Sequence, residues 1–415
     1  MKQLLNLTLQ IERYLPQQSL ELINAISSKA NQYGQRAYLV GGIVRDILLG
    51  HPNFDLDLVI EGDAVNLAHQ IAKADQVKLI THPRFGTAKL RYNNFTLDMA
   101  TARGELYAKP GALPQVTPGT INGDLFRRDF SINAMAISLN KSNYGDLIDP
   151  YQGKIDLEHH LIRILHPDSF RDDATRIFRA ARYEQRLKFE IEPQTVRLLK
   201  HNIPMLDTIS GDRIRHELEL IFREKQPEQT FNRLTELGAL KRINTSLKGN
   251  GWIAEKFEKA RSLNKPSQLY SLYLCLLIYH LHTKENEQLI NRLNISTKLA
   301  QALRDTLRLK SQLCLLDKPC IRHNEIYHLL HKYSLLAIQV NVIASESGAA
   351  CSNLDLFLTR LRYVKTSLNG EDLIKLGIPA GPELGKILQI LHTAKLNGLV
   401  RTRAQEVKLA LSQKH

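Results

Sequence analysis

Residues 39–57 read LVGGIVRDILLGHPNFDLD, and this stretch decides how the N-terminal part of the chain is expected to fold. An apolar run ends in Gly41-Gly42, a helical pattern that carries Arg45 follows, and Asp55-Leu56-Asp57 opens the next apolar run. A strand that ends in two glycines lets backbone N–H groups approach a phosphate closely, and the helix behind it points its positive end there. Arg45 would add a charge-assisted contact to the same phosphate. Taken alone, the glycine pair also fits an ordinary tight turn.

The two aspartates that follow favour a metal site. Asp55 and Asp57 are two residues apart, so in a strand both side chains point to one face. Two carboxylates this close repel each other unless a cation lies between them, and hard oxygen ligands suit Mg²⁺. Asp98 lies in another strand-like run and could complete a two-metal site if that strand neighbours the first. Solvated carboxylates at a sheet edge remain the alternative for each residue read in isolation.

Beyond this stretch the chain divides near residue 150. Up to that point, short β-type runs alternate with two helical patterns, at 20–33 and 64–74. The predicted strands cover residues 37–40, 56–60, 77–80, 87–91, 95–99 and 134–139. After residue 150 the β signal disappears, and apolar residues recur every three or four positions. The pattern predicts an α/β head followed by a long helical body.

Composition points to a polyanionic partner. Of 415 residues, 56 are Lys or Arg and 42 are Asp or Glu, which gives a formal net charge of +14. Such an excess favours nucleic acid or an anionic membrane surface. The most apolar stretch, 269–281, is broken by Ser271 and His280 and is shorter than the ~20 residues of a spanning helix, which speaks against a membrane. The N-terminus carries no signal-peptide pattern, so a cytoplasmic protein is expected. The four cysteines include no CxxC pair, so neither a zinc site nor a disulfide framework is predicted.

Two further motifs carry charge in a regular pattern. Residues 124–134 read DLFRRDFSINA, where Arg127 and Arg128 could neutralise phosphate oxygens while the following carboxylate or amide binds sugar hydroxyls. A salt-bridged loop explains this string equally well. Residues 172–176 read DDATR and open a helix, where acidic residues also serve as ordinary caps. Asp173 and Arg176 are three residues apart and therefore share a helix face.

Taken in order, these motifs resemble the class II tRNA nucleotidyltransferases, the bacterial family of CCA-adding, CC-adding, A-adding and poly(A) polymerase members. Residues 39–57 resemble the first family motif, 124–134 the second and 149–157 the third, a flexible segment that joins head and neck. Residues 172–176 resemble the nucleobase-reading motif, and 213–218 resemble a fifth motif that steadies neighbouring neck helices. The match covers about residues 35–225, and the helical remainder agrees only in type.

The resemblance implies a fold, a reaction and its partners. The fold would be α+β, with an N-terminal polymerase-beta-like mixed-sheet head followed by an all-α neck, body and tail. The implied domains are a helical lead-in (1–34), the catalytic head (35–150), the neck (151–225) and the tRNA-binding body and tail (226–415). The enzyme, expected to be monomeric, would add C or A residues to the 3′ end of tRNA by two-metal transfer from CTP or ATP, with Mg²⁺ as cofactor.

The resemblance also assigns roles to single residues. Metal binding would fall to Asp55 and Asp57, with Asp98 as a third catalytic carboxylate. The implied nucleotide-binding residues are Gly41, Gly42, Arg45, Arg128, Asp129, Asn133, Asp172, Asp173 and Arg176. Arg213 and Glu217 would be structural residues of the neck. Basic residues at helical spacing in the body would contact RNA phosphates. They are Arg304, Arg308, Arg360, Arg362, Arg401 and Arg403.

Residues 101–114 depart from the family pattern. Members that complete all of CCA often carry a flexible loop rich in Arg and Asp there, whereas this chain reads TARGELYAKPGALP. The difference leaves three outcomes open: full CCA addition, or addition of CC only or of A only beside a partner enzyme. A bacterial poly(A) polymerase is a further alternative, although no extended basic tail is present. A catalytically silent RNA-binding protein is the alternative of another class, and the intact Asp55/Asp57 pair speaks against it.

Overall fold

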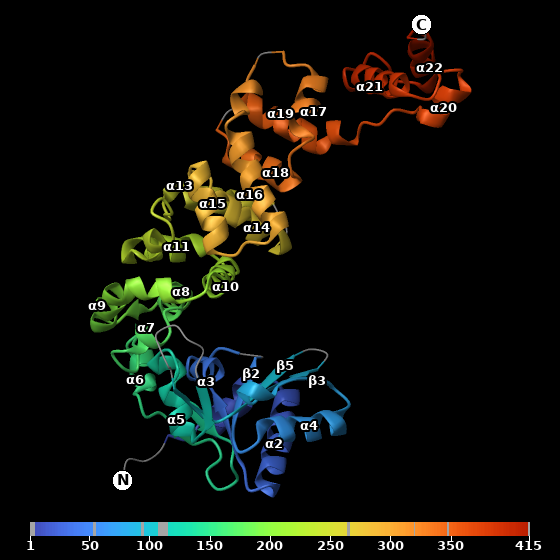
Figure 1. Ribbon diagram of the computed structural model, residues 1–415. Coiled ribbons are helices and arrows are strands. Elements are labelled where there is room, and N and C mark those ends of the chain that lie inside the picture. Colours follow the sequence, from blue (N-terminus) through green and yellow to red (C-terminus); the bar gives the residue numbers. More distant parts are fainter. Residues whose placement is uncertain are drawn as a thin grey trace. The chain divides into compact units, whose positions relative to one another are not determined.

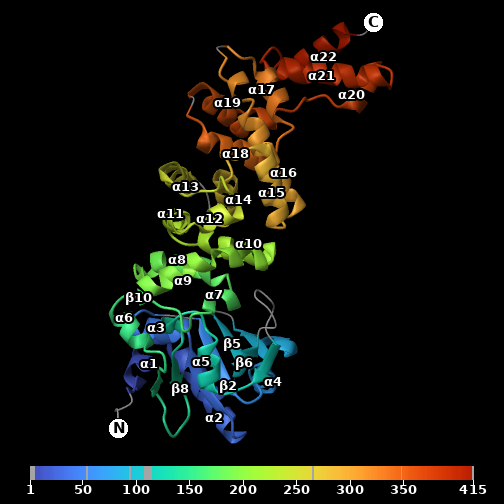
Figure 2. The same cartoon turned by 60° about the vertical axis from the view of Figure 1, so that its left-hand side comes forward.

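The protein forms two compact units in a computed structural model. The structure describes residues 5–52, 55–92, 95–106, 115–263, 266–318, 320–346 and 348–413, without the side chains of 105–106 and 266–268. The first unit contains residues 1–217 and 236–242, and the second contains residues 218–235 and 243–415. Figure 1 and the turned view in Figure 2 show the mixed α/β composition of the first unit and the helices of the second.

A mixed β-sheet is the centre of the first unit. Within the described part of the chain its seven strands run in the order β3-β4-β5-β2-β1-β8-β9. β2 and β5 are parallel, and every other neighbouring pair is antiparallel. The strands are β1 (Arg36–Val40), β2 (Leu56–Glu61), β3 (Lys78–His82), β4 (Thr87–Arg91), β5 (Thr96–Thr101), β8 (Ala136–Ser138) and β9 (Leu147–Ile148). The six strands expected from the sequence are confirmed. Apolar residues of five of them are buried, whereas Leu79 and Ile80 of the edge strand β3 are only partly buried.

Helices cover this sheet and place the loops at its edge. The first four are α1 (Thr8–Tyr14), α2 (Gln17–Gln32), α3 (Gly42–Leu48) and α4 (Ala64–Asp75), and α2 and α4 confirm the two expected helical patterns. α2 packs on β1, and α4 packs on β4 and β5 (Figure 1). α5 (Ile121–Phe126) lies on the sheet face that carries Val59, since Val59 shares one apolar cluster with Ile121 and Leu125. Asp57 points to the same face as Val59, because the two are two residues apart in β2.

Two small ribbons were not anticipated. β6 (Arg103–Leu106) pairs with β7 (Gln115–Pro118), where the sequence predicts a loop, and residues 107–114 of that loop lie outside the described residues. β10 (Leu161–Ile162) pairs in parallel with β11 (Glu190–Ile191), so the expectation that β structure ends at residue 150 is wrong. Strands of two residues carry too little alternation to be recognised in a sequence.

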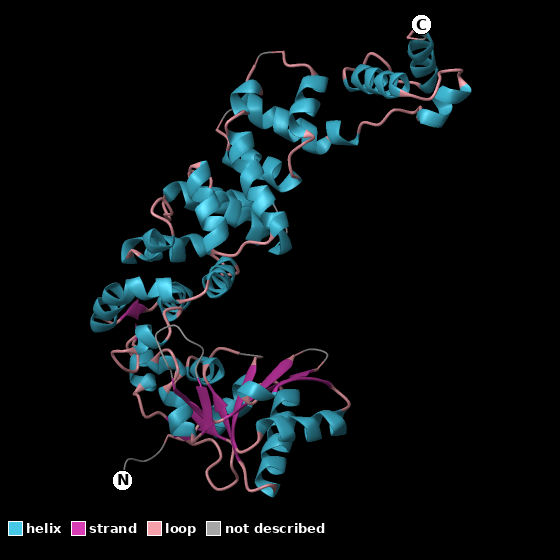
Figure 3. Ribbon diagram, viewed as in Figure 1, coloured by secondary structure: helices cyan, strands magenta, loops and turns pink. Residues whose placement is uncertain are grey.

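Helices make up the rest of the first unit (Figure 3). They are α6 (Gly153–Glu158), α7 (Ser169–Asp172), α8 (Arg176–Leu187), α9 (Pro193–Asn202), most of α10 (Gly211–Phe222) and most of α12 (Ala239–Ile243). A mixed sheet followed by helices confirms the α+β class. α7 has four residues and ends at Asp172, whereas α8 begins at Arg176, and Asp173 between them has an extended backbone. The expectation that Asp173 and Arg176 share one helix face is therefore wrong, because the chain leaves the helical conformation at Asp173.

The described residues of the second unit form helices and connecting loops, with no strand among them. Its helices are α11 (Pro227–Leu237), α13 (Gly251–Leu263), α14 (Pro266–Leu277), α15 (Thr283–Arg292), α16 (Thr297–Lys310), α17 (His323–Leu330), α18 (Leu335–Ala344), α19 (Gly348–Thr359), α20 (Gly370–Lys375), α21 (Pro382–Leu396) and α22 (Arg403–Ser412). Phe222, Phe231, Phe257 and Tyr273 form an aromatic core with ring centroids 4.3–6.1 Å apart. A separate apolar cluster holds α20, α21 and α22 together. None of the helices in the described part of the chain has the length and apolar character needed to cross a bilayer.

Candidate active site

The glycine turn after β1 leads directly into α3, and its phosphate-binding role stays a prediction. Gly41 is the N-cap of α3, with φ 76° and ψ −133°, a conformation that favours glycine. A Cβ atom placed on Gly41 would lie 2.7 Å from Nη1 of Arg128. The absence of a side chain therefore lets the Arg128 guanidinium approach the backbone of the turn, and substitution at Gly41 would be strained.

The sheet brings the predicted carboxylates together. Asp57 in β2 is in register with Asp98 in the parallel strand β5, and Asp55 directly precedes β2. Registered residues on neighbouring strands, about 4.8 Å apart, point to the same face. The expectation that the Asp98 strand neighbours the Asp57 strand is therefore confirmed. Lys89 in β4 is in register with Asp98 from the other side, and its Nζ lies 2.9 Å from Asp98 Oδ2.

The charges around Asp57 are only partly balanced. Burial, and to a lesser extent the nearby charges of Asp98 and Asp55, raise the pKa of the Asp57 carboxyl from its ordinary 3.8 to about 6, although Arg128 and Lys89 act in the opposite direction. Oxygen ligands with excess negative charge are the donor set that Mg²⁺ prefers. Asp55 and Asp57 fit a cation by this criterion. Among the described residues, however, no three His, Cys, Asp or Glu side chains are gathered closely enough to hold a metal in this conformation.

One buried carboxylate orients the arginine pair that follows α5. Asp124 is fully buried, and its Oδ1 accepts a hydrogen bond from Nε of Arg127 at 3.0 Å while its Oδ2 pairs with Nη2 of Arg128 at 3.0 Å. Charge-assisted pairs of this kind hold a guanidinium in a fixed direction. The positioning role of Asp124 was not predicted, although its i+3 and i+4 spacing to the two arginines is visible in the sequence.

Asp129 lies beneath the site rather than on its surface. It is 5% exposed, its Oδ1 accepts hydrogen bonds from the Phe130 backbone at 2.9 Å and from Asn133 Nδ2 at 3.1 Å, and its Oδ2 lies 2.6 Å from Nη2 of Arg179. Burial by itself would raise the pKa of Asp129, but Arg179 and the hydrogen bonds hold it below its ordinary value. The ribose contact assigned to Asp129 stays a prediction, and Arg179 is a partner that the sequence did not reveal.

Arg45 is engaged by the protein itself. Its Nη1 donates to Oδ1 of Asn133 at 2.8 Å, its Nε donates to Asp46 at 2.8 Å, and the residue is buried. In this conformation the side chain links α3 to the loop after α5. Its phosphate contact and the nucleotide contact of Asn133 likewise stay predictions.

Arg176 is held in one orientation at the start of α8. Its Nη1 donates to the side chain of the buried Ser169, and its Nη2 donates to the backbone carbonyl of Arg127 at 2.7 Å. A buried guanidinium bound on two nitrogens has little freedom to turn. The start of the predicted base-reading helix is thereby connected to the backbone of the arginine pair after α5.

Asp173 and Asp172 have separate partners. Oδ1 of Asp173 accepts from the backbone N–H and hydroxyl of Thr175 at 2.9 and 2.7 Å, and its Oδ2 lies 2.8 Å from Nη2 of Arg213 in α10. Burial raises the pKa of Asp172, although His166, at 3.6 Å, acts in the opposite direction. The link from Arg213 to Asp173 fits the structural role expected for Arg213.

Glu217 lies on α10, four residues after Arg213, and also faces α8. It is buried, and its Oε2 lies 3.9 Å from Nη2 of Arg182 in α8. Burial raises the pKa of the Glu217 carboxyl, while Arg179 and Arg182 act in the opposite direction. The carboxylate therefore ties α10 to α8, in keeping with the neck role expected from the sequence.

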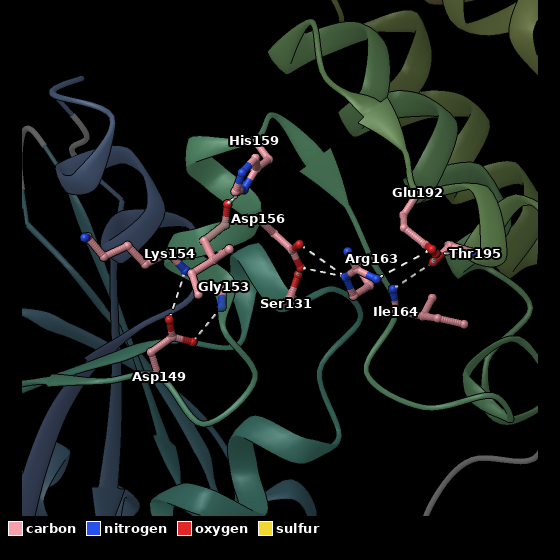
Figure 4. Close-up of polar contacts among 11 residues, drawn as sticks. Ser131, Asp149, Gly153, Lys154, Asp156, His159, Arg163, Ile164, Glu192 and Thr195 are labelled. Carbon is pink, nitrogen blue, oxygen red and sulfur yellow. Dashed lines mark hydrogen bonds and ion pairs between the residues drawn. The ribbon is translucent and has the colours of Figure 1, made fainter. Parts of the chain in front are cut away.

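A polar network occupies the segment that the resemblance describes as the head–neck joint (Figure 4). Asp149 accepts from the backbone N–H groups of Gly153 and Lys154 at 2.7 and 2.9 Å, at the start of α6. Asp156, on the same helix, accepts from the Ser131 hydroxyl at 2.5 Å and pairs with Nε of Arg163 at 3.1 Å. On its other side Arg163 faces Glu192 at 3.5 Å, and Glu192 caps α9 through the Thr195 N–H. The network links the loop after α5 to α6, β10 and α9.

Gly153 makes this joint sensitive to added volume. A Cβ atom at Gly153 would lie 2.2 Å from the Ser131 carbonyl oxygen and 2.9 Å from Cγ of Met135. We expect Gly153→Ala to lower the free energy of unfolding by roughly 1–3 kcal/mol, because backbone must shift to admit the methyl group. Thermal unfolding measures the change. Gly385→Ala, in α21, is the control because a Cβ there meets nothing within 4 Å, and an equal loss in both variants would contradict the steric explanation.

The arginines expected to bind RNA differ in their surroundings in the second unit. Arg304 forms two 2.7 Å hydrogen bonds with Glu287, and Arg403 pairs with Asp372 at 2.7 Å. Arg362 lies 4.4 Å from the centre of the Tyr363 ring. Arg308, Arg360 and Arg401 are exposed. The sequence shows the spacing of these residues, but it did not predict which of them would be engaged by a neighbouring acid.

Comparisons with known proteins bear on both units. Residues 37–163 match the family described as "Poly A polymerase head domain", and residues 188–248 match one described as "Probable RNA and SrmB- binding site of polymerase A". An A-adding tRNA nucleotidyltransferase from Halalkalibacterium halodurans is 31% identical, over 94% of this chain and 92% of the relative. Another A-adding enzyme, from Geobacter sulfurreducens, is 33% identical over 97% of this chain but 48% of the relative, so the chain spans about half of that protein.

Among solved structures, an apo form of a CCA-adding enzyme has a TM-score of 0.84 and 30% sequence identity. The match covers 99% of this chain and all of that chain. The likeness therefore extends through the helices of the second unit, where the sequence offered no motifs.

Proposed function

Because this chain belongs to the class II tRNA nucleotidyltransferase family, we propose that it transfers AMP from ATP to the 3′-hydroxyl of a tRNA that ends in CC. The observation that carries the proposal is the position of Asp57 and Asp98, side by side on neighbouring strands and on the sheet face that carries α5, which the two arginines follow in the chain. A cation site next to phosphate-binding groups is the arrangement that nucleotidyl transfer requires.

The cation and the residues around it would contribute to different parts of the reaction. The RNA 3′-hydroxyl loses its proton to water, and its oxygen attacks the α-phosphate to form a new P–O bond. The bond from the α-phosphorus to the bridging oxygen breaks, and pyrophosphate leaves with its electrons. Mg²⁺ bound by Asp55 and Asp57 would supply charge for the triphosphate and favour ionisation of the attacking hydroxyl, with a second ion near Asp98 in the two-metal form. Arg128, held by Asp124 beside Gly41, would contact the phosphates. Positioning and charge then supply most of the acceleration.

Base selection would fall to Asp173 and Arg176. Cytosine and adenine each present an amino donor beside a ring-nitrogen acceptor, whereas uracil and guanine present a carbonyl in the place of that amino group. A carboxylate acceptor and a guanidinium donor therefore suit C and A and leave U and G with unpaired groups. The fixed orientation of Arg176 on Ser169 and the Arg127 carbonyl supports this role.

The choice of A rests on the relatives. The two relatives described above, at 31% and 33% identity, are both A-adding enzymes. The low charge of residues 101–114 agrees with partial addition. Complete CCA addition is the second candidate, since the structure with TM-score 0.84 is that of a CCA-adding enzyme.

The tRNA would contact the second unit through phosphates. Arg308, Arg360 and Arg401 are exposed and suit such contacts, which depend on charge and shape rather than base sequence. Arg304 and Arg403 are already paired with acids, so they would contribute less. The net charge of +14 supports the same partner.

Three tRNA transcripts test the proposal. One lacks CCA, one ends in C and one ends in CC, and each is incubated with Mg²⁺ and either ATP or CTP before the 3′ ends are sequenced. A single A added only to the CC-ended transcript supports the proposal. Stepwise addition of C, C and A supports the second candidate, a long A tail indicates a poly(A) polymerase, and no extension indicates a silent RNA-binding protein.

Replacing both base-reading residues should relax base choice. We expect Asp173→Ala with Arg176→Ala to reduce the preference for the correct nucleotide over UTP and GTP roughly 10- to 100-fold, because the hydrogen-bond mismatch is lost. Single-nucleotide kcat/KM values measure this ratio. Asp212→Ala with Arg215→Ala is a matched control, since that pair has the same spacing on α10. An unchanged preference in the first variant would show that other groups read the base.

A further inference from the structure

Three charged side chains form one row across the sheet. Asp57 in β2 is in register with Asp98 in β5, and Asp98 is in register with Lys89 in β4. β2, β5 and β4 are consecutive in the sheet, so the three side chains point to one face. Nζ of Lys89 lies 2.9 Å from Oδ2 of Asp98. The third carboxylate of the site therefore already has a positive partner that belongs to the chain.

This ion pair differs from an ordinary surface pair in its position on the sheet. Lys89 and Asp98 are 39% and 45% exposed, and a pair with this exposure contributes little to stability by itself. Its neighbour in the row, however, is Asp57, and Asp55 lies just before Asp57 in the chain. An ammonium beside these carboxylates both neutralises Asp98 and repels any second cation that approaches it.

We propose that Lys89 is a resident counter-ion of Asp98 that competes with a divalent cation for this carboxylate. The proposal rests on the metal site of the proposed function and adds a residue that sets its cation affinity. Asp55 and Asp57 accept the first cation, while the Asp98 side is available only when the ammonium moves away. The described residues offer no ready-made cluster of three ligands, which agrees with Asp98 being engaged by Lys89.

Binding of Mn²⁺ to the full-length protein without nucleotide tests this inference. Free Mn²⁺ is measured by electron paramagnetic resonance during a titration of wild type, Lys89→Met, Lys89→Arg and Lys78→Met. Lys78 is the matched control, because it lies on β3, next to β4, at an exposed position two residues from the partner of Lys89. We expect Lys89→Met to bind Mn²⁺ roughly tenfold more tightly, or to gain a second bound ion, because one repelling charge is removed. Lys89→Arg should resemble wild type, and Lys78→Met should change the affinity less than about twofold.

A second pair of variants separates the inference from the proposed function. If Lys89 acts mainly through Asp98, Lys89→Met should have a clearly smaller effect in an Asp98→Asn background, where the carboxylate charge is absent and only the direct repulsion by the ammonium is left to remove. An equal effect of Lys89→Met and Lys78→Met would overturn the inference and leave the metal site standing. If wild type binds no Mn²⁺ and Lys89→Met binds none either, the metal site of the proposed function is itself wrong.

Discussion

Replacing Asp57 by Asn should abolish nucleotide transfer and, at the same time, stabilise the metal-free protein. The loss of a metal-binding carboxylate should reduce transfer by roughly 10³-fold, equivalent to ~4 kcal/mol. The gain in stability follows from the environment of Asp57, whose pKa is raised to about 6 by burial and by Asp98 and Asp55. A neutral amide of the same shape removes that repulsion, and we expect an increase of roughly 1–3 kcal/mol in the free energy of unfolding.

The gain should depend on pH in a defined direction. A carboxyl whose folded pKa is above its unfolded value destabilises the protein most when it is ionised in both states, above about pH 6. The difference in Tm between Asp57→Asn and wild type, measured without divalent cations, should therefore be full above pH 6 and vanish toward pH 4. Asp63→Asn, a change of the same kind at an exposed helix N-cap where Asn serves equally well, is the control. A lower Tm for Asp57→Asn at neutral pH would contradict the account of charge repulsion.

Removing the Arg179 guanidinium should destabilise the first unit more than Gly153→Ala does. Its Nη2 lies 2.6 Å from the buried carboxylate of Asp129, so Arg179→Met leaves that carboxylate without its charge partner. The loss of one partner from a fully buried pair costs about 3–5 kcal/mol, and because Arg179 is 34% exposed we expect a loss near the lower end of this range. Thermal unfolding at neutral pH should show a decrease in Tm of roughly 10 °C.

The pH dependence again has a definite sign. In wild type the pKa of Asp129 is held below its ordinary value, so its contribution to stability is present above about pH 4 and is lost as the pH falls further. In Arg179→Met the Asp129 charge destabilises the folded protein, so the loss of stability relative to wild type should be largest at neutral pH and shrink toward pH 4. Asp129→Asn in the same chain should restore part of the loss. Arg197→Met, at an exposed position of α9, should change stability by less than ~0.5 kcal/mol, and a comparable loss there would exclude a specific role for the pair.

The parts of the fold that could be predicted are those whose signal is local. β1 to β5 and the helices α2 and α4 follow from the alternation or the helical spacing of apolar residues, and both patterns are recorded in consecutive residues. The ribbon of β6 and β7 and the pairing of β10 with β11 were missed, because polar or two-residue strands have no such pattern. The same local reason predicts Asp55 and Asp57 on one face, which stays a prediction because Asp55 lies just before β2.

The remaining features of the site depend on partners that are distant in the sequence. Arg45 and Asp129 were predicted to face the nucleotide, yet both are buried against protein groups. Lys89 and Arg179 were not predicted as residues of the site. In the structure Lys89 pairs with Asp98, and Arg179 pairs with Asp129. A charged residue has the same letter whether water, an acid or a backbone carbonyl surrounds it, so its partner cannot be deduced from its neighbours in the chain.

The sequence by itself therefore determined the order of the motifs, the α+β division of the chain and the family to which they belong, because each of these depends on short runs of residues and their spacing. Only the tertiary structure decided which carboxylates meet and which cations accompany them. The register of β2, β5 and β4 places Asp57, Asp98 and Lys89 in one row. That register results from the packing of the whole sheet, and side-chain energies depend on distances and burial that packing alone sets.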